Sequence, residues 1–136
     1  MAIHREIFIL AGLEHPNLMK LFEVIDTKTH VNLLVELCHG QSLFDYVKRY
    51  GSKGKFGGQG SGAKATWFLG EAITKNIFRE ITTGVAHLHE MGLVHRGLTT
   101  DHVMIDDQGA NAKIIDFGSA TSFQPNDKLA ALSGAP

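Results

Sequence analysis

Apolar residues recur along the chain at two kinds of spacing, and these spacings predict separate helices and strands. Steps of three and four residues indicate helices, whereas short runs rich in branched residues between polar turns indicate strands. The predicted elements are a helix at residues 3–13, strands at 18–25 and 31–37, a short helix at 43–50 and a long helix at 71–91. The long helix has the clearest periodicity, and Gly92 follows it as a C-terminal cap.

Residues 51–70 interrupt this pattern. Glycine and small polar residues dominate the first part of the segment, which is typical of a flexible linker. A phosphate-binding P-loop is the alternative, but the step Gly54-Lys55 is followed by Phe56 where that loop needs Ser or Thr. We therefore expect a linker segment whose residues 51–64 are exposed and irregular.

Composition excludes several functional classes. With 136 residues, 43% of them hydrophobic, the chain can form one small globular domain. A formal net charge of −1 gives no reason to expect nucleic-acid binding, and no apolar run is long enough to span a membrane. The single cysteine, Cys38, excludes an internal disulfide framework and favours a reducing, cytoplasmic location.

The candidate chemistry lies between Leu93 and Gly118. A turn containing His95-Arg96 is followed by an apolar run at 103–105, a polar bend, a second apolar run and then Asp116-Phe117-Gly118. A cluster of histidines around His95 could suggest zinc, but no cysteine or closely spaced carboxylate completes such a site.

The spacing of these motifs resembles that of eukaryotic protein kinases, in which an H-R-D-L-x-x-x-N loop precedes a metal-binding D-F-G turn. The chain is most similar to the AMP-activated-kinase-like branch of Ser/Thr kinases, near the sperm motility kinases, in the segments EHPNLMKLFEVIDT, AKIIDFG and FQPNDKL. The resemblance implies an α+β fold with a partial small lobe and hinge at residues 1–38, built from a helix and a hairpin. Residues 39–136 would form a partial, mainly helical large lobe, with a Gly-rich insertion relative to the family at residues 51–70. It also implies truncation, since a complete kinase domain is about twice this length.

Within the catalytic loop, His95 and Arg96 match the family pattern and three positions depart from it. The departures are Gly97 for the catalytic Asp, Thr99 for the phosphate-contacting Lys and His102 for the metal-binding Asn. Asp116 keeps the metal position, but His102 is a poor second ligand because Mg²⁺ prefers oxygen.

The resemblance also implies where ATP would lie. Backbone groups of Glu36 and Cys38 would pair with the adenine edge, and Met104 would contact the adenine face. Ser42 stands where the family has an acidic ribose partner, although with Asp45 three residues on it also forms a helix-capping signature. Glu6 matches the Glu of the regulatory helix in the small lobe of kinases. The alternative is that Glu6 is an ordinary charged residue on the solvated face of its helix.

Four side chains match the stack that joins the two lobes of a kinase: Leu10, Leu21, His95 and Phe117. Ordinary core packing is the alternative role, and both roles place these side chains inside. We expect the following side chains to be buried: Leu10, Leu21, Ile77, Ile81, Met104 and Phe117.

Phosphoryl transfer needs a metal ion, a phosphate-holding Lys and an Asp that accepts the hydroxyl proton. Loss of the general base alone lowers the rate by roughly 10²–10⁴. We therefore expect a Ser/Thr-kinase-like chain with ATP and Mg²⁺ as the family's cofactors, weak or absent ATP binding, and no useful activity. Two alternatives stay open: a pseudokinase-type module that binds a protein partner, or a gene-model fragment without independent function.

Overall fold

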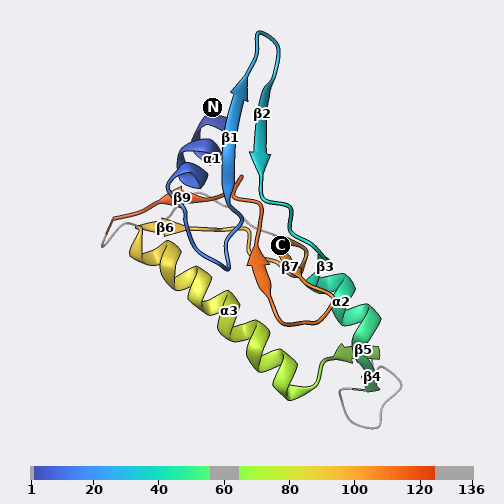
Figure 1. The fold of residues 1–136 in the computed structure, drawn as a ribbon. Helices are drawn as coiled ribbons and strands as arrows, with labels where there is room; N and C mark the ends of the chain where they lie inside the picture. The colour runs from blue at the N-terminus through green and yellow to red at the C-terminus, as the bar shows by residue number, and fades with distance from the viewer. Residues whose placement is uncertain (1, 56–64, 125–136) are drawn as a thin grey trace.

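A computed structural model describes residues 2–55 and 65–124 (Figure 1). The elements in chain order are α1 (Ala2–Ala11), β1 (Leu21–Asp26), β2 (Val31–Val35), β3 (Gln41–Ser42), α2 (Leu43–Tyr50), β4 (Ser52–Lys55), β5 (Ala65–Phe68), α3 (Glu71–Glu90), β6 (Leu93–Val94), the 3₁₀ turn η1 (Thr100–His102), β7 (Val103–Ile105), β8 (Ala112–Ile114) and β9 (Thr121–Ser122). The helices are interspersed with small antiparallel sheets, which confirms the predicted α+β class.

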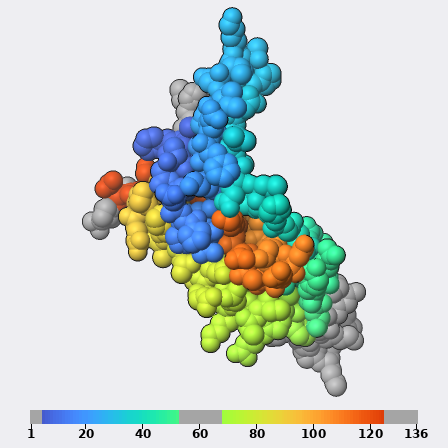
Figure 2. Space-filling view, in the orientation of Figure 1, coloured from blue at the N-terminus to red at the C-terminus, as the bar shows by residue number. Residues whose placement is uncertain are grey.

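Strands β1 and β2 form an antiparallel hairpin that projects from the rest of the molecule (Figures 1 and 2). Its turn is closed by the backbone N–H of Thr27, which donates to the carbonyl of His30 at 2.8 Å. The hairpin is shorter at its base than predicted, because Leu18 instead forms an isolated parallel bridge with Ile114 of β8. This bridge ties the hairpin to the sheet that carries the candidate site.

A second sheet has the order β3-β7-β8, with antiparallel pairs throughout. Ser42 pairs with Met104, and Met104 pairs with Lys113, so residues of three distant segments share one rung of the sheet. Strands β6 and β9 form a separate pair, which holds the segment after Gly118 against the end of α3. Residues 95–118 therefore lie between the paired strands β6 and β9 in the chain, and they include β7 and β8 of the sheet.

Two groups of buried side chains make up the core, and α3 contributes to both. The first contains Ile9, Leu10, Leu13, Leu18, Leu88, Ile114, Phe117 and Ala120. The second contains Tyr46, Ile77, Val103, Ile105 and Ala112. Close packing of α3 on the sheet depends on Gly84, where a Cβ atom would lie 3.1 Å from Leu18 Cδ2 and 3.2 Å from Ile114 Cδ1.

The burial prediction is confirmed for Leu10, Ile77 and Phe117 and wrong for the other three side chains. Leu21, Ile81 and Met104 are only half-buried. Leu21 and Ile81 pack at the margin of the core, where one side of each remains uncovered. Periodicity identifies the apolar face of an element but does not show how far a covering layer extends over it.

The prediction that residues 51–64 are irregular is also wrong at the start of the segment. Residues 52–55 form β4, which pairs with β5 in the register Ser52↔Phe68 to Lys55↔Ala65. Gly51 is half-buried rather than exposed. The backbone supplies the ladder hydrogen bonds, so a run of glycine and lysine can pair without strong strand propensity. The remainder of the prediction, for residues 56–64, lies outside the described residues.

The helix predictions agree with the structure to within two residues at each end. Helix α1 ends at Ala11 rather than at residue 13, and α3 ends at Glu90 with Gly92 following at φ +67°. None of the helices within residues 2–55 and 65–124 combines the length and apolar character that crossing a membrane requires.

Candidate functional site

His95 lies at the centre of the candidate site, with 5% of its surface exposed. Its Nε2 donates to the carbonyl of Ile115 at 3.1 Å, and its Nδ1 accepts from the N–H of Gly97 at 3.2 Å. Burial lowers the pKa of the ring and therefore favours the neutral form that these two contacts require. The imidazole thus joins the loop after β6 to the segment after β8.

The predicted stack of four side chains is contiguous. Leu10 and Phe117 belong to the same buried group, and Leu21 packs against that group from β1. The ring of His95 lies 5.1 Å from the ring of Phe117, measured between centroids. The stack joins α1 and the projecting hairpin to the candidate site.

Arg96 and Gly97 follow His95 in an unusual backbone turn. Arg96 has φ +59°, and its Nε donates to the carbonyl of Ser119 at 2.9 Å. Gly97 has no side chain toward the site, although a Cβ atom there would be in ordinary contact with Ser119 Cβ at 3.6 Å and with His95 Nδ1 and Ser119 Oγ at 3.8 Å. The position therefore has space for the Asp that the family carries but offers no group that could accept a proton.

His102 and Asp116 are brought together across the site. Nδ1 of His102 lies 2.6 Å from the carbonyl oxygen of Gly97, and Nε2 lies 3.1 Å from Asp116 Oδ2. Both neighbours are acceptors, so each ring nitrogen donates when it carries a proton. The second carboxylate oxygen of Asp116 accepts from the N–H of Gly118 at 3.1 Å. Asp116 itself has φ +61°.

Glu6 of α1 is half-buried and faces the same site. Its Oε2 lies 3.9 Å from the position that a Cβ atom would take on Gly118. Burial, and next the negative charge of Asp116, raise the pKa of the Glu6 carboxyl. The side chain of Glu6 is therefore partly desolvated beside Asp116, and its role in the site stays a prediction.

The two hinge residues lie beside β2. Glu36 Oε2 is 3.1 Å from Lys113 Nζ, and the N–H of Glu36 donates to the carbonyl of Lys20 at 2.8 Å. Cys38 is half-buried, and burial raises the pKa of its thiol. Their predicted role at an adenine edge stays a prediction.

The remaining predicted residues lie along the β3–β7 edge and in the loop before it. Ser42 caps α2: its Oγ accepts from the N–H of Asp45 at 3.1 Å and lies 3.0 Å from Asp45 Oδ2. This contact confirms the capping role and occupies the hydroxyl that a ribose would need. Met104 lies beside Ser42 in the sheet, and Thr99 accepts a backbone hydrogen bond from His102 at 3.1 Å.

The magnesium ion that the kinase resemblance implies does not fit this site. One oxygen of Asp116 accepts a hydrogen bond from the N–H of Gly118, and the other lies 3.1 Å from Nε2 of His102, so the neighbouring side chain presents nitrogen rather than oxygen. In residues 2–55 and 65–124, no three histidine, cysteine, aspartate or glutamate side chains gather to hold a metal ion. The capped hydroxyl of Ser42 weakens the fit for a nucleotide in the same way.

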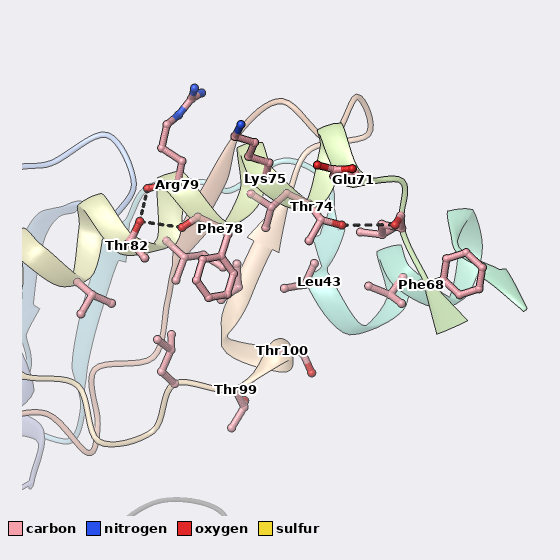
Figure 3. Close-up of a pocket in the computed structure, with 17 residues that line it drawn as sticks. Leu43, Phe68, Glu71, Thr74, Lys75, Phe78, Arg79, Thr82, Thr99 and Thr100 are labelled. Carbon is pink, nitrogen blue, oxygen red and sulfur yellow. Dashed lines mark hydrogen bonds between the residues drawn. The ribbon is translucent and has the colours of Figure 1, made fainter. Parts of the chain in front are cut away.

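An apolar groove runs beside the loop at residues 98–100, between α3 on one side and α2 with β5 on the other (Figure 3). Its volume is about 1490 Å³, and Phe78 and Phe68 line it with 66% and 53% of their surfaces exposed. Lys75 and Arg79 extend from one edge of the groove, away from its floor (Figure 3). The groove is therefore apolar inside, and its edge carries Lys75 and Arg79 together with the acidic Glu71.

Two contacts of the site escaped prediction from the sequence. Ser119 accepts from Arg96 through its backbone carbonyl, for which the sequence gives no signal. The ion pair between Lys113 and Glu36 was also not predicted. Lys113 lies in β8, and the alternation of side chains along this strand was a usable signal that Lys113 faces away from the core.

Residues 1–136 match the family model described as protein kinase domain. The chain is 33% identical over 129 residues to sperm motility kinase 3A of Mus musculus, and the aligned residues cover 95% of this chain and 22% of that protein. It is 30% identical over 133 residues to the SNF-related serine/threonine-protein kinase of Rattus norvegicus, covering 98% of this chain and 16% of that protein. The chain thus spans about a fifth of the length of the curated relatives that it matches first.

Proposed function

The chain belongs to the protein kinase family, and we propose that it is a non-catalytic, kinase-like module that acts by binding a protein partner. Members of the family generally transfer phosphate from ATP to protein substrates with the help of Mg²⁺. The observation that carries the proposal is Gly97, because a residue without a side chain stands where the family has its proton acceptor. We place the module in the cytoplasm, since its single cysteine suits a reducing compartment.

Two arrangements support loss of phosphoryl transfer. The carboxylate of Asp116 accepts a hydrogen bond from the N–H of Gly118 and lies 3.1 Å from Nε2 of His102, so a metal ion would compete with protein groups for both oxygens. Ser42 is committed to the N-terminus of α2. Positioning and charge neutralisation account for most of the catalysis in this reaction class, and neither is provided by these arrangements.

The test is transfer of radiolabelled phosphate from ATP to a generic basic peptide, measured for the wild-type chain and for Gly97→Asp. Space around Gly97 admits the new side chain, so the variant should fold, which a circular-dichroism melt verifies. We expect no transfer by either protein, because the returned base supplies at most about 10⁴ in rate and leaves the metal site unchanged.

A third protein makes the result decisive. Gly97→Asp/Asp116→Ala removes the carboxylate at the metal position and serves as the background control. Transfer by the wild-type chain above the background of the double variant would contradict the proposal outright. Transfer by Gly97→Asp that is lost in the double variant would mean that one substitution alone separates the chain from a working enzyme.

Partner binding is supported by the apolar groove along α3. An open apolar groove can take the apolar face of an amphipathic helix. Lys75 and Arg79 outnumber Glu71 along its edge and favour a partner helix with acidic flanks (Figure 3).

A further inference from the structure

We propose that His102 is a positioning residue that replaces a metal ion as the cross-link between the catalytic-type loop and Asp116. One imidazole lies between the carbonyl of Gly97, 2.6 Å from Nδ1, and the carboxylate of Asp116, 3.1 Å from Nε2, and the ring donates to both acceptors when it is the imidazolium. The cross-link makes the geometry of the site independent of divalent cations. The inference rests on family membership and on these contacts, and it does not require the chain to be inactive.

The backbone at both ends of the cross-link is unusual. Among the described residues, only Arg96 and Asp116 have a positive φ without being glycine, at 59° and 61°. Such conformations cost of order 1–3 kcal/mol each and persist where the surroundings hold them. His102 contacts the residue after Arg96 and contacts Asp116 directly, so one side chain spans both turns.

A backbone hydrogen bond brings the two segments together but does not orient the carboxylate of Asp116. The N–H of Ile115 donates to the carbonyl of His102 at 2.9 Å, which brings η1 beside the segment before Asp116. That bond leaves the Asp116 carboxylate free to turn. The contact with Nε2 of His102 orients it, and its other oxygen then accepts from the N–H of Gly118.

The same contacts explain why a cation would not bind at Asp116. A hard cation such as Mg²⁺ or Mn²⁺ needs several oxygen ligands in a regular arrangement. At Asp116 it would have to displace the imidazole from one oxygen and find an oxygen where the ring nitrogen stands. An asparagine at position 102 would supply a carbonyl oxygen and remove the competing donor.

The experiment uses the ¹⁵N-labelled full chain, whose mass of 14.8 kDa suits amide NMR. Mn²⁺ at millimolar concentration is the probe, because its paramagnetism broadens the resonances of amides near a bound ion. The reporter is the amide of Gly118, which bonds to Asp116 Oδ1. The proteins are wild type, His102→Asn, Asp116→Asn and the double variant, with His30→Asn as a control at an exposed histidine remote from the site.

In the wild-type chain we expect Mn²⁺ to broaden the Gly118 amide no more than it does in Asp116→Asn. His102→Asn should show selective broadening of this amide, and the double variant should lose it. Without any cation, hydrogen exchange of the Gly118 amide should be about tenfold faster in His102→Asn, the size expected for losing one hydrogen bond to a charged group. His30→Asn should match the wild type in both measurements.

Two results would overturn the inference. The first is Asp116-dependent broadening of Gly118 in the wild-type chain, a comparison that needs no His102 variant to fold. The second is unchanged exchange of the Gly118 amide in His102→Asn, which would mean that the ring does not hold the carboxylate. Neither readout involves phosphoryl transfer, so failure here is distinct from failure of the proposed loss of catalysis.

Discussion

Replacing Phe117 with alanine should destabilise the chain more than any comparable change at the surface. The side chain is fully buried, with 0% exposure, and it packs among Leu10, Leu18 and Ile114. Phe→Ala in a core costs about 3–5 kcal/mol. Of this, about 0.5–1.5 kcal/mol comes from the ring contact with His95 at 5.1 Å.

This loss is large against the whole stability of a small domain, which is about 5–15 kcal/mol. Urea unfolding followed by far-UV circular dichroism measures it directly. With a slope of about 1–3 kcal/mol per molar urea, the midpoint should fall by at least about 1 M. Phe117→Leu keeps most of the volume and should lose less than about 1.5 kcal/mol.

Phe78→Ala is the matched control, because it removes the same atoms from a side chain that is 66% exposed. Its midpoint should change by no more than the equivalent of about 0.5 kcal/mol. If Phe117→Ala and Phe78→Ala unfold at the same urea concentration, Phe117 does not hold α1 and the hairpin to the site, and the stack described above is not a stabilising unit.

Two further predictions concern pH and partner binding. Burial lowers the pKa of His95 and of His15, so the unfolded chain takes up protons first as the pH falls. Their contribution to the free energy of unfolding is complete above about pH 6.5 and is lost as the pH falls below it. The urea midpoint should therefore be lower near pH 5.5 than near pH 7.5, and this difference should be smaller in His15→Gln. A fluorescent model helix with a leucine face and glutamate flanks should bind the chain, and Phe78→Ser should weaken binding about tenfold or more while Phe22→Ser, at the exposed hairpin, should not. Equal binding by these two variants would argue against the groove as the docking site.

The helices were predictable from the sequence because their signals are local. Helix α3 follows from apolar residues at helical steps, and the cap of α2 follows from Ser42 and Asp45. The same steps do not distinguish a covered side chain from an uncovered one, and Phe78 lies in the open groove while Ile77 beside it is buried. Covering depends on which distant segments pack there, and local spacing does not contain that information.

The site was predictable in its residues but not in its contacts. The kinase resemblance placed His95, His102 and Asp116 in one site, and the structure brings them together. The bridge from His102 to the carbonyl of Gly97 was not predictable, because it depends on the backbone turn at Arg96. A contact to a main-chain atom leaves no mark on residue identity, so a sequence pattern gives no sign of it.

The β4–β5 hairpin gives the chain a place where its length can change at little cost. Lys55 pairs with Ala65, so whatever peptide joins them begins and ends at neighbouring points. Closing a longer flexible loop costs only about 0.6 kcal/mol for each doubling of its length. Residues gained or lost there do not alter the spacing of α2 and α3. Related proteins can therefore diverge in length at this junction, and a tag or a sensor peptide can be grafted into it, while the residues around Asp116 keep their arrangement.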